Sequence, residues 1–452
     1  MKSKIVSSIK RLACVLALLC AIVAHARADT ITVTNTNDSG PGSLRQALAD
    51  ANDGDTITFA VTGTIGLTSG ELLVDKSIII SGPGADNLAV NGNAKSRVFE
   101  IGSGRSVSIS GMTIVNGDAS GDVPDGGGIY NDHATLTLGD CTVSNNSAFR
   151  DGGGILNDGA ALIVNNCVIS SNVTGNDGGG ICNEDNGGNA SLQITDSVLS
   201  TNSAEFGGGI CHDGRMGGTA TASISNSTLS SNSGGYGGGA IFSIGDVGGA
   251  TLTINNSTIS GNSAPAYGGG IYNHSTLTIS NSTLSDSAAV HGGSIYNEAF
   301  VWIGNTVLKA GAKGENIFNN GGTITSLGYS LSSDDAGGFL TGPGDQINAD
   351  PMLGPLQDNG GPTFTHTLLP GSPAIDAGDP SFTPPPIFDQ RGPGFDRVVG
   401  GRIDIGSFEV QSAGPTPTPT PSPSPMPTPT PTAAPGATPR PRPTPHQRPT
   451  PP

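Results

Sequence analysis

The chain has 452 residues, of which 70 are glycine, and its formal net charge at pH 7 is −17. The glycines cluster in triplets about 24–31 residues apart rather than at every third position, which excludes a collagen-like repeat. All 37 acidic residues lie between residues 29 and 411, so this part of the chain repels the phosphates of nucleic acids and of acidic membranes. We therefore expect no nucleic-acid partner.

Residues 1–28 are typical of a secretory signal peptide. A basic segment from Lys2 to Arg11 precedes an apolar run from Leu12 to Ala24, and small residues before Asp29 suit cleavage. The apolar run is shorter than the roughly 20 residues that a membrane span needs. We predict a secreted or cell-surface protein without a membrane span after cleavage. A retained anchor and lipoprotein processing at Cys20 are the alternatives.

Residues 29–125 are predicted to form an N-terminal cap and the first β-coils. Alternating residues indicate strands over 29–39, 54–59 and 74–81. Between the first two, Ser43-Leu-Arg-Gln46 has the spacing of a capping box and predicts a short helix that ends near Asn52. Such a helix would cover the hydrophobic end of the first coil. The alternative is an ordinary helix in a small separate domain.

A motif related to Gly-Gly-Gly-Ile-Tyr-Asn recurs in residues 126–310 and dominates the sequence. Its isoleucines are Ile129, Ile155, Ile181, Ile210, Ile241, Ile271 and Ile295. Between the motifs, apolar and polar residues alternate with the period of two that is typical of strands. Three short strands in so few residues leave no room for the helical crossover of a βαβ unit. We therefore predict an all-β fold, a parallel β-helix, with a β-propeller as the alternative.

Polar residues recur at two fixed positions of the repeat. One column follows the first strand and contains Asp140, Asn166, Asp196, Asn226, Asn256, Asn281 and Asn305. The other ends the second strand and contains Asn146, Asn172, Asn202, Asn232 and Asn262. Side chains stacked one coil apart satisfy each other's hydrogen bonds, so we interpret both columns as structural, and Asp140 and Asp196 as inward corners.

A third column is predicted to point outward and to carry hydroxyl groups. It pairs Thr228 with Ser230, Thr258 with Ser260, and Thr283 with Ser285. Such an array suits contact with ice or a glycan, although threonine is also simply a good strand former.

Four cysteines remain after removal of the signal, and they occupy columns of the repeat. Cys141 and Cys167 share a small inward site with later serines, whereas Cys182 and Cys211 share a site with aromatic residues of other repeats. Their parallel Cβ vectors disfavour an unstrained disulfide, so we favour stacked thiols, with disulfides as the alternative. A metal site at these thiols is disfavoured, because only His212 lies near them in sequence.

Residues 311–411 are predicted to form the last coils and a C-terminal module, and residues 412–452 a disordered Pro/Thr-rich tail or stalk. The segment from Gly42 to Leu48 resembles the CSLREA-type motif of bacterial secreted β-helix proteins, with Gly42 and Gln46 in place of its Cys and Glu. The stretches 350–362, 369–378, 389–392 and 404–409 resemble the choice-of-anchor Q proteins, and the glycine motifs resemble the repeats of polymorphic outer-membrane proteins. These resemblances imply a right-handed, pectate-lyase-like β-helix at the cell surface, in a family without an established activity.

The sequence assigns no catalytic, cofactor-binding or metal-binding residue, and no cofactor is expected. Polysaccharide hydrolases need paired carboxylates, and we see no column that stacks two of them outside the corners. The histidines His133, His212, His274 and His291 are interpreted as exposed corner residues. Asp334 and Asp335 offer oxygen ligands for a structural Ca²⁺, although a solvated loop is the simpler interpretation.

The function predicted from these features is a non-enzymatic, adhesin-like module that binds an extracellular polysaccharide or surface protein as a monomer. The alternatives are a Ca²⁺-dependent polysaccharide lyase, a glycoside hydrolase, and a structural spacer of the envelope.

Overall fold

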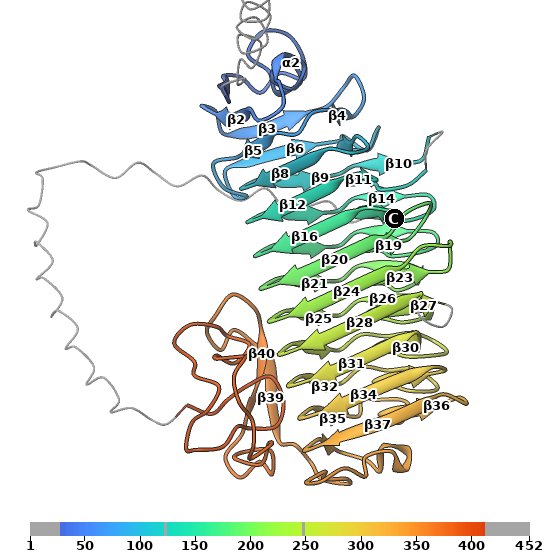
Figure 1. Ribbon diagram of the computed structural model, residues 1–452. Coiled ribbons are helices and arrows are strands. Elements are labelled where there is room, and N and C mark those ends of the chain that lie inside the picture. Colours follow the sequence, from blue (N-terminus) through green and yellow to red (C-terminus); the bar gives the residue numbers. More distant parts are fainter. Residues whose placement is uncertain (1–27, 122–123, 246–248, 412–452) are drawn as a thin grey trace, which may run out of the picture. The chain divides into compact units, whose positions relative to one another are not determined.

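The computed structural model describes residues 28–121, 124–245 and 249–411, which form a parallel β-helix (Figure 1). The predicted fold class is therefore confirmed. The proline-rich tail and all but the last residue of the predicted signal peptide lie outside the described residues. Each regular coil runs through a strand of sheet C, then one of sheet A, then one of sheet B, and five coils add a short strand of sheet D.

Sheet A has 12 parallel strands. They are β1 Thr30–Val33, β2 Thr56–Phe59, β5 Ile79–Ser81, β8 Ser106–Ser110, β12 Thr135–Gly139, β16 Ala161–Asn165, β20 Ala190–Thr195, β24 Ala220–Ser225, β28 Ala250–Asn255, β31 Thr276–Ser280, β34 Phe300–Gly304 and β37 Thr323–Gly328.

Sheet B has 11 strands. They are β3 Gly63–Gly66, β6 Leu88–Asn91, β9 Thr113–Val115, β13 Thr142–Ser144, β17 Val168–Ser170, β21 Val198–Ser200, β25 Thr228–Ser230, β29 Thr258–Ser260, β32 Thr283–Ser285, β35 Val307–Lys309 and β38 Leu331–Ser332.

Sheet C has 10 strands and sheet D has five. Those of sheet C are β4 Leu72–Val74, β7 Phe99–Ile101, β11 Ile129–Asp132, β15 Ile155–Asp158, β19 Ile181–Glu184, β23 Ile210–Gly214, β27 Ile241–Gly245, β30 Ile271–His274, β33 Ile295–Asn297 and β36 Ile317–Asn319. Those of sheet D are β10 Asp118–Ala119, β14 Ser147–Ala148, β18 Val173–Thr174, β22 Ser203–Phe206 and β26 Ser233–Gly237. Sheet D was not foreseen from the sequence, because its strands are too short to show a period.

The isoleucine of each glycine motif lies in the core of sheet C, as predicted. Successive copies are direct neighbours, beginning with Ile129 beside Ile155 and ending with Ile271 beside Ile295. All seven are almost completely buried. The spacing of 24–31 residues is therefore the length of one coil, and the length differences fall outside the paired strands.

The column that begins with Asn146 forms the predicted internal ladder. The Nδ2 of Asn146 donates to the Oδ1 of Asn172 at 3.0 Å, and the same bond recurs at 3.0 Å from Asn172 to Asn202 and from Asn202 to Asn232. These side chains are at most 1% exposed. The ladder satisfies amide groups inside a hydrophobic core, where an unpaired one would cost about 1–3 kcal/mol.

The column that begins with Asp140 forms corners, but its side chains point outward, so the prediction of inward corners is wrong. All seven residues have φ between 48° and 53°, a left-handed conformation that Asn and Asp tolerate better than most residues. Asp140 and Asn166 are exposed and are joined by a hydrogen bond of 2.6 Å. The left-handed turn reverses the direction of the side chain relative to the strand that precedes it.

The predicted helix is α2, Leu44–Asp50, and it covers the first coils (Figure 1). The Oγ of its N-cap residue Ser43 accepts a hydrogen bond from the Gln46 amide at 3.2 Å. The side chain of Gln46 instead bonds Asp50, so only half of the capping box forms. Leu44, Ala47 and Leu48 belong to the main core cluster, which excludes a separate small domain.

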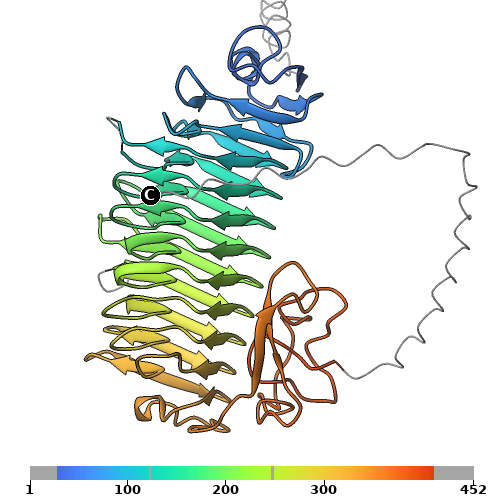
Figure 2. The ribbon, with the colours of Figure 1, turned by 180° about the vertical axis from the view of Figure 1, so that it is seen from behind.

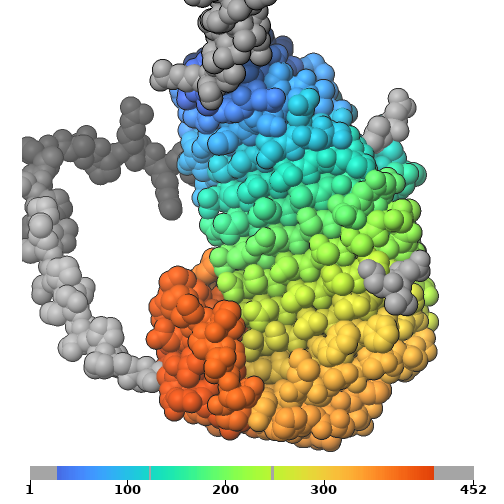
Figure 3. Space-filling view, viewed as in Figure 1, coloured from blue at the N-terminus to red at the C-terminus, as the bar shows by residue number. Residues whose placement is uncertain are grey.

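The C-terminal segment folds back against sheet B over the later coils (Figures 1, 2 and 3). It contains the antiparallel pair β39 Leu353–Gln357 and β40 Thr365–Leu368, while the 3-10 helix η1, Ala336–Gly338, lies just before it in the chain. We call residues 350–411 the C-terminal module.

The hydroxyl array predicted to be exposed lies under the C-terminal module. Five of its six residues are buried, and Ser230 is half-buried. Thr228 donates to the backbone oxygen of Phe364 at 2.6 Å, and Ser260 lies 2.9 Å from the Nε2 of His366. Contact of this array with ice or a glycan is therefore excluded. Its hydroxyl groups instead bind another part of the same chain.

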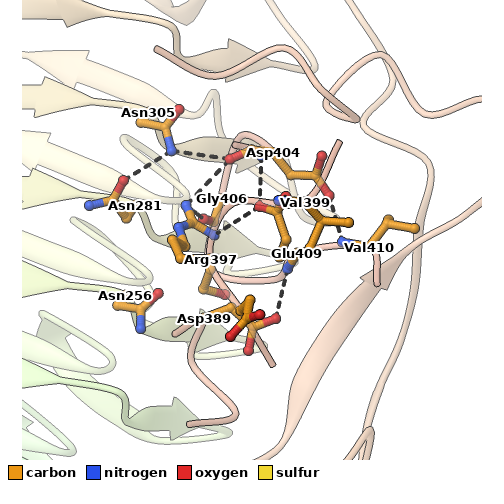
Figure 4. A network of polar contacts seen from close by, with 12 residues as sticks. Asn256, Asn281, Asn305, Asp389, Arg397, Val399, Asp404, Gly406, Glu409 and Val410 are labelled. Atoms are coloured by element: carbon orange, nitrogen blue, oxygen red, sulfur yellow. Dashed lines mark hydrogen bonds and ion pairs between the residues drawn. The ribbon is translucent and has the colours of Figure 1, made fainter. Parts of the chain in front are cut away.

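The two C-terminal motifs that resemble the choice-of-anchor Q proteins, residues 389–392 and 404–409, build the polar interior of this module (Figure 4). Fully buried Arg397 donates to the Gly406 oxygen at 2.6 Å and lies 3.9 Å from the carboxylate of Glu409. Burial raises the pKa of Glu409 to about 8. Arg391 makes a two-pronged ion pair with Asp389, and its guanidinium lies over the rings of Phe395 and Phe408. These residues therefore have structural roles.

The four cysteines of the described chain are free thiols, as favoured from the sequence. The amide of Cys141 donates to the Sγ of Cys167, and the amide of Cys167 donates to the Oγ of Ser197, so hydroxyl groups continue the column that the two sulfur groups begin. Cys182 and Cys211 pair in register on the outer side of sheet C, in a second hydrophobic cluster with Leu156 and Phe242.

Candidate functional site

The outer face of sheet A carries an uncharged strip, which was not predicted from the sequence. Its two columns have no Asp, Glu, Lys or Arg from β12 to β37, and every member is exposed or half-exposed. The first column is Thr135, Ala161, Ser191, Thr221, Thr251, Thr276, Phe300 and Thr323, and the second is Thr137, Ile163, Gln193, Ser223, Thr253, Thr278, Trp302 and Thr325. In a chain with 37 acidic residues, a neutral face of this length makes the strip a candidate binding surface.

The middle of the strip is hollowed because its side chains are small. A shallow groove of about 410 Å³ runs across β16, β20, β24 and β28, with Ala161, Ser191 and Ser223 along its floor and sides. The inward neighbours, such as Leu192 and Leu252, are buried in the core and hold the floor rigid.

An aromatic platform lies at the C-terminal end of the strip. Phe300 and Trp302, the only tryptophan in the chain, stand two residues apart on β34 and therefore on the same face. Their ring centroids are 6.2 Å apart and their planes differ by 20°. Phe300 is 41% exposed, so this apolar surface is open to solvent.

A pocket of about 260 Å³ adjoins the platform where sheet C turns into sheet A. Phe300 and Thr276 line it from sheet A, and His274 and Glu298 line it from the sheet C side. Gly321 and Gly322 form the opposite wall, and a Cβ added to Gly322 would lie 2.4 Å from the Nδ2 of Asn297. The pocket thus combines an apolar edge with a carboxylate and an imidazole.

Glu298 is held as a carboxylate by hydrogen bonds. Burial acts to raise its pKa, but donation from Tyr272, Asn320 and Tyr296 outweighs this and leaves the pKa below its usual value. The Tyr272 hydroxyl donates to Oε2 at 2.6 Å, and the Tyr296 hydroxyl lies 3.1 Å from Oε1. The Nδ1 of His274 is buried without a hydrogen-bond partner among the described residues. One carboxylate and one imidazole suit hydrogen bonding to a ligand, whereas glycoside hydrolysis needs two carboxylates.

The outer side of sheet C carries two stacks of carboxylates, so the statement that no column stacks them is wrong. Asp132, Asp158, Glu184 and Asp213 are register neighbours on successive strands. Asp125, Asp151 and Asp177, which each precede a glycine triplet, form the second stack through amide-to-carboxylate bonds. The signal was present in the sequence: an acid directly precedes the first three triplets, and an acid directly follows the first four Ile-X-Asn or Ile-X-His segments.

Crowding of these carboxylates changes their titration. Burial and then the charge of Asp151 raise the pKa of Asp177 to about 7, and burial with the charges of Asp151 and Asp158 raises that of Glu184 to about 8. Two arginines neutralise other members of the stacks. Arg150 bonds both carboxylate oxygens of Asp125, and Arg215 does the same with Asp213.

The remaining predicted candidates have structural surroundings. His212 is completely buried, so its assignment as an exposed corner residue is wrong, whereas His133, His274 and His291 are half-exposed. Asp334 accepts hydrogen bonds from the Asn316 and Ala336 amides and from Ser332, which occupy the oxygens that a Ca²⁺ ion would need.

The chain is similar to known proteins in one repeat of its sequence and in its fold. The model of the Chlamydia polymorphic membrane protein repeat matches residues 256–274. Pectate lyase Pel9A has a similar fold, with a TM-score of 0.50 and 14% identity over 85% of this chain and 97% of that chain. The ORF18 protein of Geobacillus virus E2 aligns with a TM-score of 0.42 and 12% identity, over 72% of this chain and 64% of that one. The PL6 family alginate lyase AlyGC aligns with a TM-score of 0.39 and 14% identity, over 75% of this chain and 55% of that one.

No curated protein matches the sequence. Within the described residues, no helix has the length and apolar character needed to cross a membrane.

Proposed function

We propose that this chain is a non-enzymatic, exported β-helix that binds a neutral polysaccharide along the uncharged strip. The observation that carries the proposal is the difference in charge between two faces: the strip is neutral over eight strands, whereas a stack of four carboxylates lies on sheet C. Sugar rings present apolar faces of C–H groups that pack on aromatic rings, and their hydroxyls bond to Thr, Ser and Gln side chains. Phe300 and Trp302 supply the aromatic surface, and Glu298 in the adjoining pocket accepts hydrogen bonds from sugar hydroxyls.

A location at the cell surface is consistent with the match to the polymorphic membrane protein repeat and with the predicted signal peptide. We include in the proposal that residues 350–411 are a choice-of-anchor Q module and residues 42–48 a degenerate CSLREA motif. Their packing supports a capping role for both, because α2 covers the first coils and the C-terminal module covers sheet B.

The decisive experiment is a binding assay with the full chain against neutral β-glucans and mannans, and against polygalacturonate and alginate as acidic comparators. We expect binding to a neutral polymer and at least roughly tenfold weaker binding in the Trp302→Ala variant, a loss of about 1.4 kcal/mol. Phe149→Ala is the matched control, because Phe149 is 75% exposed but lies away from the strip. Exclusive binding to the acidic polymers, or equal losses in both variants, would contradict the proposal.

A polysaccharide lyase is the second candidate, and the carboxylate stacks with Arg150 and Arg215 are the observation in its favour. Both arginines are engaged in two-pronged ion pairs, which leaves neither as a free base. The test is release of unsaturated ends from polygalacturonate or alginate by the full chain with added Ca²⁺. Activity that disappears in Arg215→Ala would establish the lyase and exclude the non-enzymatic function.

A further inference from the structure

Asp132, His133 and Asp158 converge where sheet C turns into sheet A. They lie on the outer side of this corner, away from the core. Each offers one ligand atom, and these three atoms all lie within 4.8 Å of one another. Asp132 and Asp158 end the neighbouring strands β11 and β15, and His133 follows Asp132 directly. His133 Nδ1 lies 2.7 Å from Asp132 Oδ1, a hydrogen-bond distance, so the imidazole and this carboxylate already face each other.

Asp158 is the unusual member of this group. It is only 4% exposed, and its Oδ1 is buried without a hydrogen-bond partner of good geometry among the described residues, although the Asn186 side chain lies close enough to act on this carboxylate. Its other oxygen, Oδ2, accepts from the Tyr130 hydroxyl at 2.7 Å, which fixes the orientation of the carboxylate. A buried carboxylate oxygen without a donor is costly, and a bound cation would satisfy it.

The backbone holds the imidazole in place. His133 has a φ of 48°, a conformation that is uncommon for residues other than glycine, and its amide donates to the backbone oxygen of Asp158 at 2.9 Å. A Cβ added to Gly159 would lie 2.8 Å from the Nε2 of His133, so the imidazole packs directly on this glycine. Nε2 thus lies against Gly159, and Nδ1 is the ring nitrogen that faces the Asp132 carboxylate.

We propose that Asp132, His133 and Asp158 bind one divalent transition-metal ion of the Zn²⁺ class. Two carboxylates and one neutral imidazole carry two negative charges, which balance the charge of a divalent ion. Mixed nitrogen and oxygen donors favour Zn²⁺ over Ca²⁺, because Ca²⁺ takes oxygen ligands. Asp132 and His133 remain about one-third exposed, which gives the ion a path from solvent and leaves room for water as a further ligand. Tyr130 is a positioning residue, since it orients Asp158.

The test uses the full chain, freed of metal with a chelator and titrated calorimetrically with Zn²⁺. We expect one saturable site that a large excess of Ca²⁺ does not displace, and a Tm that rises with the Zn²⁺ concentration. His133→Asn and Asp158→Asn should each weaken Zn²⁺ binding at least roughly tenfold, and Tyr130→Phe by about 10- to 100-fold. Asn tolerates the left-handed backbone of His133, so the first variant is expected to fold.

His291→Asn and Asp196→Asn are the matched controls, because each removes the same kind of group elsewhere on the solenoid. Both should bind Zn²⁺ as the unaltered chain does. The absence of saturable binding, displacement by Ca²⁺, or unchanged affinity in both site variants would overturn the proposal. Replacing Zn²⁺ with Co²⁺ gives a spectroscopic check, since an absorption band sensitive to His133→Asn reports the imidazole ligand and an insensitive band contradicts it.

Discussion

Thr258 Oγ1 donates a hydrogen bond of 2.6 Å to Gln390 Oε1, although the two residues are 132 positions apart in the chain. The Nε2 of the same glutamine donates to Thr228 Oγ1 at 2.9 Å and to Thr363 Oγ1 at 3.0 Å. Gln390 thus joins two coils of sheet B to the C-terminal module, and it is fully buried. Repeated hydroxyls on a solenoid face can therefore be a docking surface for the chain itself.

Gln390→Ala is expected to lower the free energy of unfolding by about 2–4 kcal/mol, because the buried hydroxyls of Thr258, Thr228 and Thr363 each lose one hydrogen bond. Urea denaturation of the full chain measures this loss. Gln357→Ala is the control: Gln357 lies in the same module, is exposed, and should change stability by no more than about 0.5 kcal/mol. Similar losses in the two variants would show that the buried network contributes little.

The internal ladder gives a second prediction. Asn202 donates to the Ile169 oxygen at 2.9 Å and to Asn232 at 3.0 Å, and it accepts from the amide and side chain of Asn172. Asn202→Ala removes all of these side-chain hydrogen bonds inside the core. It should lower the free energy of unfolding by about 3–5 kcal/mol, measured by urea or thermal unfolding.

Asn189→Ala provides the comparison for the ladder variant. Asn189 also accepts hydrogen bonds from the next coil, through Thr219, but it is exposed, so water replaces what the substitution removes. We expect a change within about 0.5 kcal/mol. If Asn202→Ala is equally mild, the ladder is not a source of stability.

The coil could be predicted from the sequence because every coil contains its own copy of the periodic residues. The isoleucine of each motif and the Asn146 column keep one position per coil, and insertions fall at corners, so the stack could be derived from spacing alone. The covering of Thr258 could not be derived, because its partner Gln390 belongs to a segment with no period. The carboxylate stacks were not predicted for a different reason. Asp158 and Glu184 differ in residue type and lie at the edge of the motif, so they do not repeat as one residue type in the way that the Asn and Ile columns do.

The thiols on sheet C should be inert. Cys182 and Cys211 are at most 1% exposed, and contact with Cys211 together with burial raises the pKa of Cys182 well above its ordinary value. Because the thiolate is the reactive species, neither cysteine should react with a thiol reagent before unfolding. Ser223→Cys places a thiol on the exposed strip and serves as the reactive control. Peptide mapping that finds a disulfide between Cys182 and Cys211 would contradict the assignment of free thiols.

His212 provides a prediction about pH, because it continues a second buried ladder, on sheet C, in which Asn131, Asn157 and Asn183 hold the same position in the preceding coils. Its Nδ1 accepts from the Asn183 amide group at 3.0 Å, and its Nε2 donates to the Thr251 oxygen at 3.0 Å, so the neutral ring satisfies both neighbours. Burial lowers the pKa of His212 to about 4, while the Thr251 bond and the charge of Asp213 oppose this shift only partly. Since the unfolded ring has a pKa near 6.5, acid favours the unfolded chain.

The stability that neutral His212 contributes is therefore complete above about pH 6.5 and is lost as the pH falls toward 4, by on the order of 3 kcal/mol. Other groups, including the crowded carboxylates of sheet C, titrate in the same range. The comparison with His212→Asn separates them, because asparagine does not titrate and restores the amide of the ladder. The measurement is urea unfolding of both proteins from pH 7 to pH 4: the difference in unfolding free energy should shift in favour of the variant as the pH falls. Two curves that stay parallel would mean that His212 is not buried as a neutral ring.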